Sequence, residues 1–137
     1  MTLRLFLINA AILMAVAAPG SAAEWTTSYG QMTLPDAPSG GPVRANYTDD
    51  SGRIIGQLLV PKCMDCGVVL RGIWVEAGSA ERCTTEEDGS HHWGNVELTF
   101  NPSYTSFEGG WDYCGGGSTR SWRGQIGITR IPQKGSK

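Results

Sequence analysis

Val96-Glu97-Leu98-Thr99-Phe100 is the stretch of sequence that decides the fold. Apolar and polar residues alternate in it, and because successive side chains of a strand point to opposite faces, the pattern predicts a half-buried β-strand. The segments 107–113 and 122–128 repeat this alternation. On the polar faces of the three segments lie the charged residues Glu97, Glu108, Asp112 and Arg123. We expect these four side chains to be exposed to solvent.

Four less regular strand candidates precede these three, at residues 25–34, 43–48, 54–60 and 70–74. The connections between candidates are short except for the loop from Ala77 to His92, and short connections join antiparallel neighbours. The sequence therefore predicts an all-β fold, a single antiparallel meander of about seven to eight strands that closes into a small barrel or sandwich. The 19 glycines and the low share of charged residues, 18%, also favour turns and strands over helices.

Glycine alternates with tryptophan on the apolar faces, as at Gly72 and Trp74 and again at Gly109 and Trp111. Residues two apart share a face of a strand, so each glycine leaves a gap that an indole from an adjacent strand can fill. We expect Trp74, Trp111 and Trp122 to be core residues, although each could also offer a flat face to a sugar ring or an apolar ligand.

These motifs resemble those of small exported bacterial β-meander domains of undefined function. The motifs are Gly72-x-Trp74, Val96-x-Leu98-x-Phe100, Phe107-x-Gly109-x-Trp111 and Trp122-x-Gly124. More loosely, residues 25–130 are similar to avidin and lipocalin (calycin-like) barrels. The resemblance implies a barrel that holds a ligand inside or at one end. No binding residue is carried over, because Ala23-x-Trp25 stands where a lipocalin has Gly-x-Trp and the avidin biotin contacts are missing.

The first 23 residues have the three regions of a secretory signal. A positive charge at Arg4 precedes an apolar run from Leu5 to Ala18, and small residues end the segment at Ala23. The run is shorter than the roughly 20 residues that a membrane helix needs. We therefore expect cleavage after Ala23, a single domain over 24–137, no stable membrane span, and a periplasmic or secreted location.

The four cysteines of an exported protein normally form disulfides. Three pairings are possible, and we favour Cys83 with Cys114 and Cys63 with Cys66. Cys63 and Cys66 have the spacing of a redox-active dithiol, but they lie in a turn between strands, without the helix N-terminus that activates such a thiolate. A structural disulfide is therefore the favoured interpretation. A four-thiolate zinc site would need a second Cys-x-x-Cys pair.

The candidate site residues lie in the long loop and directly after it. The segment 86–92 is the densest cluster of acidic and imidazole side chains, and His91 or His92 with Glu86 or Glu87 could act as acid and base or bind zinc or copper. A solvated acidic loop is the commoner meaning of such a cluster. Trp93 follows the loop and is expected near a barrel mouth. We predict Trp93, His91 and His92 as ligand-binding residues, and no catalytic residue, metal or cofactor.

The net charge of −2 shows no excess of basic residues, so nucleic-acid binding is not expected. The pattern favours a non-catalytic exported binding protein that takes up a small apolar molecule, a glycan or an envelope partner in a preformed site. One alternative is a structural or inhibitory module that binds another protein through edge strands and the long loop. Another is a metal-dependent enzyme that uses the His91/His92 loop. The pattern leaves the oligomeric state open.

Overall fold

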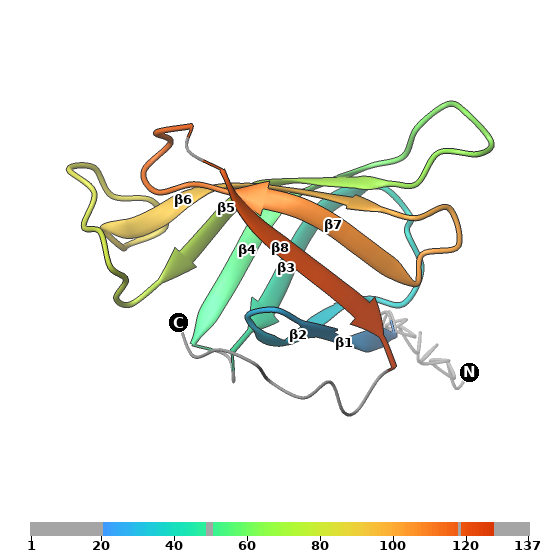
Figure 1. Ribbon diagram of the computed structural model, residues 1–137, viewed down its shortest axis with the longest axis horizontal. Helices are drawn as coiled ribbons and strands as arrows, with labels where there is room; N and C mark the ends of the chain where they lie inside the picture. Colours follow the sequence, from blue (N-terminus) through green and yellow to red (C-terminus); the bar gives the residue numbers. More distant parts are fainter. Residues whose placement is uncertain (1–20, 49–50, 118, 128–137) are drawn as a thin grey trace, which may run out of the picture.

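The sheet is a closed barrel of eight antiparallel strands (Figure 1). The computed structural model describes residues 21–48, 51–117 and 119–127. The strands are β1 (Ala22–Thr27), β2 (Gly30–Pro35), β3 (Gly41–Tyr47), β4 (Gly52–Leu59), β5 (Val69–Glu76), β6 (His92–Phe100), β7 (Ser106–Trp111) and β8 (Arg120–Ile126). Each strand pairs with the next, and β1 also pairs with β8, which closes the sheet. The all-β meander is confirmed, and it closes as a barrel.

One strand expected over 25–34 is wrong, because this segment forms the β1–β2 hairpin. The chain reverses at Ser28 and Tyr29, and Gly30 follows with a φ of 96°. The Thr27 hydroxyl stabilises the turn: it donates to the Gly30 carbonyl at 2.8 Å and accepts from the Tyr29 N–H at 3.0 Å. The hairpin supplies the eighth strand.

The predicted leader lies mostly outside the described residues, which begin at Ser21. Its last residues, Ala22 and Ala23, belong to β1 and pair with Pro35 and Leu34. Cleavage after Ala23 would shorten β1 by these two residues and keep Trp25 in the barrel. In the described part of the chain, no helix has the length and apolar character needed to cross a membrane.

The alternation predicted for β6 is confirmed, with Val96, Leu98 and Phe100 buried inside the barrel. On the outer face, the Arg71 guanidinium of β5 pairs with Glu97 at 2.7 Å. This ion pair is exposed, so it contributes less to stability than the core does.

The expectation that Asp112 is exposed is wrong, because its side chain is only 5% accessible. Its carboxylate accepts hydrogen bonds from the backbone N–H of Asn95 at 2.8 Å and from those of Gly115 and Gly117 at 3.1 Å. Several such bonds stabilise a buried carboxylate. Asp112 therefore organises the β7–β8 turn.

Two glycines make room for aromatic rings of neighbouring strands. Gly94 on β6 pairs with Trp74 on β5, and a Cβ at Gly94 would come within 2.6 Å of the indole nitrogen. Gly124 on β8 likewise leaves room for the Phe107 ring. The expectation that indoles fill the gaps at Gly72 and Gly109 is wrong. Gly72 faces the backbone of β4 and Gly109 faces β6, so both glycines allow neighbouring strands to approach closely.

The two ends of the barrel are built differently. One end is filled by Trp25, Phe100, Tyr104 and Phe107, whose ring centroids lie 4.9–5.7 Å apart. The Tyr104 hydroxyl donates to the Pro35 carbonyl at 2.9 Å and fixes this plug. The other end is surrounded by the β1–β2, β3–β4, β5–β6 and β7–β8 connections and contains a cavity.

Both expected disulfides are present. Cys83–Cys114 joins the β5–β6 loop to the β7–β8 turn, and Cys63–Cys66 lies in the β4–β5 loop. Two disulfides are compatible with an oxidising, extracellular compartment.

Candidate binding site

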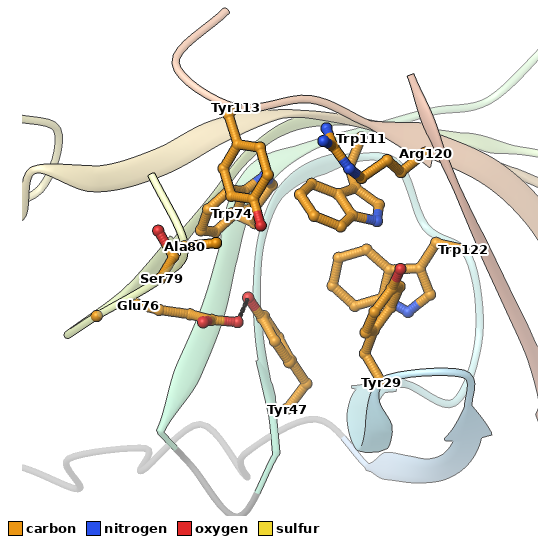
Figure 2. Close-up of a pocket in the computed structure, with 11 residues that line it drawn as sticks. Tyr29, Tyr47, Trp74, Glu76, Ser79, Ala80, Trp111, Tyr113, Arg120 and Trp122 are labelled. Carbon is orange, nitrogen blue, oxygen red and sulfur yellow. Dashed lines mark hydrogen bonds between the residues drawn. The ribbon is translucent and has the colours of Figure 1, made fainter. Parts of the chain in front are cut away.

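The cavity at the open end of the barrel has a volume of about 440 Å³. Six of its eleven lining residues are aromatic, and Figure 2 shows them surrounding a common space. The lining residues are Tyr29, Tyr47, Trp74, Glu76, Gly78, Ser79, Ala80, Trp111, Tyr113, Arg120 and Trp122. They come from the β1–β2, β5–β6 and β7–β8 connections and from strands β3, β5, β7 and β8, so the site exists only when the barrel is closed.

Three buried tryptophans form the deep wall of the cavity: Trp74, Trp111 and Trp122. The Trp74 indole N–H donates to the Asp112 carbonyl at 2.8 Å, and the Trp122 N–H donates to the Thr27 hydroxyl at 3.1 Å. The Trp111 indole nitrogen is buried without a hydrogen-bond partner among the described residues. Two of the three indoles are therefore held in place by hydrogen bonds at their N–H groups.

The aromatic rings meet nearly at right angles. The Trp111 ring is perpendicular to those of Trp74 and Tyr113, with interplanar angles of 84° and 83° and centroids 5.4 and 5.0 Å apart. Tyr29 meets Trp122 at 79° and 5.2 Å. Such edge-to-face pairs are favoured electrostatically, and they place different rings as adjoining walls of one box.

One carboxylate lies at the side of this box. Glu76 ends β5, is half-buried, and accepts a hydrogen bond from the Tyr47 hydroxyl at 2.9 Å (Figure 2). Burial, and then the negative charge of Glu76, raise the pKa of the Tyr47 phenol well above its usual value. Tyr47 therefore remains a neutral donor to Glu76 at physiological pH.

One guanidinium lies at the opposite side. Arg120 begins β8 and is exposed, and its Cζ atom is 4.6 Å from the centroid of the Tyr113 ring and 5.3 Å from that of Trp111. Figure 2 shows the side chain extending past Trp111 toward Tyr113. These distances are those of a cation–π contact.

The β5–β6 loop forms part of the rim through Gly78, Ser79 and Ala80. The backbone N–H of Ser79 donates to His92 Nδ1 at 3.0 Å, which attaches this part of the loop to the start of β6. Further along, Arg53 donates to the Asp88 carboxylate at 2.6 Å, and this contact holds the pKa of Asp88 below its usual value. These two contacts and the Cys83–Cys114 disulfide anchor the loop to the barrel.

The predicted ligand-binding residues lie around this loop and outside the cavity lining. Trp93 is half-buried and donates to the Thr85 carbonyl at 3.0 Å. His91 Nδ1 is 2.9 Å from the Cys83 carbonyl, and its Nε2 is 3.4 Å from Glu86, so the structure does bring the expected histidine and carboxylate together. His92 supports the rim. Ligand binding by these three residues stays a prediction.

No group of three or more His, Cys, Asp or Glu side chains in the described ranges is arranged to hold a metal ion. The chemistry that the cavity offers is instead contact with aromatic faces, one carboxylate and one guanidinium.

Sequence reasoning missed Tyr29, Tyr47, Glu76 and Arg120 as site residues. For Trp93 a signal was present: alternation continued backward from the buried Val96 puts Gly94 inward and Trp93 outward. For Tyr47 and Glu76 the signal lies in the strand register, because both residues pair with Gly52.

Searches with this chain found no matching family model, no matching curated protein and no matching solved structure.

Proposed function

We propose that this chain is a non-catalytic exported binding protein that holds a small apolar or glycan-like ligand in the aromatic cavity. The observation that carries the proposal is the cavity itself. Its volume of about 440 Å³ lies within the range of roughly 300–1,000 Å³ typical of small-molecule sites. It also has the usual composition of such sites, with apolar walls and a few polar groups at the rim.

Binding would be driven by burial of ligand surface against rings that are already in place. Burying about 200 Å² of apolar ligand surface contributes about 5 kcal/mol before the cost of association. The hydrogen bonds of Trp74 and Trp122 fix two of the walls, so little ordering of these side chains is needed. The resemblance of the sequence motifs to calycin-like barrels supports the same use of the barrel end.

The two alternative functions have less support. Closure pairs β1 with β8, so every strand has a neighbour on both sides, and only short stretches, such as the start of β3, are free to pair with a partner strand. The His91–Glu86 contact lies in the β5–β6 loop, away from the cavity lining, with no third metal-competent side chain beside it in the described residues.

The test is to block the cavity mouth without altering the barrel. Ala80 lines the mouth and is exposed, so Ala80→Trp should fill the entrance and leave the core intact. Ala77→Trp is the matched control, because Ala77 is exposed on the same loop but does not line the cavity.

The readout is saturable change in tryptophan fluorescence and calorimetric binding with a panel of a disaccharide, a phenol, an alkyl alcohol and a quaternary ammonium salt. We expect at least one panel member to bind the parent and Ala77→Trp, and not Ala80→Trp. Equal binding by both variants, or saturation by no panel member, would contradict the proposed function.

A further inference from the structure

We infer that the ligand of this cavity carries an organic cation, of the quaternary ammonium type, which is held between aromatic faces and balanced by Glu76. The inference rests on the proposed binding function and assigns the cavity a cationic ligand in place of an apolar or glycan-like one. Its basis is the kind of surface that the cavity presents, together with its charges.

The described part of the cavity wall is made mainly of aromatic side chains, with little aliphatic surface. Among the described residues, Ala80 is the single aliphatic side chain in the lining, whereas the leucines, isoleucine and valines of the core lie elsewhere in the barrel. An alkyl ligand would bind equally well to a wall of leucine or valine side chains. A cation gains only from the negative face of an aromatic ring, so a wall of indoles and phenols favours a cationic ligand.

The perpendicular arrangement strengthens this preference. Trp111 meets Trp74 and Tyr113 at 84° and 83°, so a compact group in the box is approached by rings from more than one direction. A methylated ammonium group is nearly spherical and has no preferred donor direction, and it can contact several ring faces at once. A flat sugar ring would use one or two of these walls.

Glu76 supplies the opposite charge. Its carboxylate lies in the lining, and the Tyr47 hydroxyl orients it at 2.9 Å. A quaternary ammonium ion cannot donate a hydrogen bond, so its interaction with Glu76 would be Coulombic and would not require Tyr47 to leave.

Arg120 shows that part of this wall already accepts a cation. Its guanidinium carbon lies 4.6 Å from the ring centroid of Tyr113 and 5.3 Å from that of Trp111. Because Arg120 is exposed, its contact can be exchanged for water at little cost. In our proposal the ligand ammonium competes with this guanidinium for the Trp111–Tyr113 corner, and Arg120 weakens binding of the cation.

The decisive experiment compares choline with 3,3-dimethylbutan-1-ol, which has the same shape and no charge, by calorimetry and tryptophan fluorescence on the disulfide-bonded protein. We expect choline to bind about tenfold more tightly than the neutral alcohol, in line with a cation–π and carboxylate contribution. A disaccharide is included as the third ligand.

Two variants test the charges. Glu76→Gln should weaken choline binding about fivefold more than it weakens binding of the neutral alcohol, and Arg120→Gln should strengthen choline binding severalfold. The matched controls are Glu108→Gln and Arg123→Gln, which make the same changes on the outer face of β7 and β8 and should alter neither ligand. If Glu76→Gln does not fold, the Arg120→Gln variant still tests the proposal.

Equal affinity for choline and the neutral alcohol, or binding of the disaccharide alone, overturns the cationic ligand and leaves the proposed binding function standing. Failure of every ligand to bind overturns both. Unchanged choline binding in Arg120→Gln overturns the competition by Arg120.

Discussion

The ring of Tyr47 lies directly over Gly52, and this contact lets its hydroxyl reach Glu76. Gly52 on β4 pairs with Tyr47 on one side and with Glu76 on the other. Because Gly52 has no side chain, the phenol crosses the intervening strand and donates to Glu76 at 2.9 Å. One glycine thus places both the phenol and the carboxylate in the cavity.

Gly52→Ala is therefore expected to disturb the binding site as well as the fold. A Cβ at Gly52 would overlap the Tyr47 ring, and forcing a methyl group into a packed site costs about 1–3 kcal/mol. Denaturant unfolding followed by fluorescence measures the loss. Gly78→Ala is the control, because a Cβ there meets no atom within 4 Å. Equal stability of the two variants would show that the Tyr47 ring does not depend on Gly52.

The two disulfides are expected to differ in how much they stabilise the protein and in how accessible they are to reductant. Cys83–Cys114 encloses a loop of 31 residues, and Cys83 is only 2% exposed, so replacing both residues by alanine should cost about 3–4 kcal/mol. Cys63 and Cys66 are exposed and three residues apart, so their removal should cost less.

Mild reduction provides a second measurement on the same protein. Mass spectrometry after limited reductant and alkylation should find Cys63 and Cys66 labelled first, because exchange requires access to the sulfur atoms. If Cys83 and Cys114 were labelled first, the expected difference in accessibility would be wrong.

More of the fold than of the site could be predicted from the sequence, and the reason is physical. Alternation is a local property, so the inward face of β6 was visible at Val96, Leu98 and Phe100. The β1–β2 turn was missed because it depends on the Thr27 hydroxyl, a side-chain contact with no strong local signature.

The site depends on register and on position along the barrel axis, and neither is a local property. Tyr47 and Glu76 are 29 residues apart and meet only because β3, β4 and β5 align at Gly52. Trp74 and Trp122 were expected as core and are buried, yet they also line the cavity because they lie close to the end of the barrel. Alternation shows that a residue points into the barrel, but it does not show how close that residue lies to the end of the barrel.

Alkaline pH should destabilise the plugged end of the barrel. Burial, with a smaller contribution from Asp36, raises the pKa of Tyr104 to about 12. Unfolded tyrosine ionises near pH 10. Because the folded state disfavours the phenolate, the stabilisation is fully present below about pH 10 and is lost as the pH rises towards 12.

Unfolding free energy measured between pH 8 and 12, with tyrosinate absorbance followed in parallel, checks this expectation. Tyr104→Phe should reduce the loss of stability in that range. A slope unaffected by Tyr104→Phe would assign the loss to other groups, among them Tyr47, whose pKa is also raised by burial.

The hydrogen bond from the Ser79 N–H to His92 Nδ1 is expected to hold the rim of the cavity in place. His92→Leu removes the acceptor, so amide exchange at residues 78–80 should accelerate and ligand binding should weaken severalfold, with little change in global stability. His92→Asn offers a side-chain oxygen near the position of Nδ1 and should restore most of the protection. Hydrogen exchange by mass spectrometry measures both variants, and exchange at the parent rate in His92→Leu would mean that the rim is held by contacts other than His92.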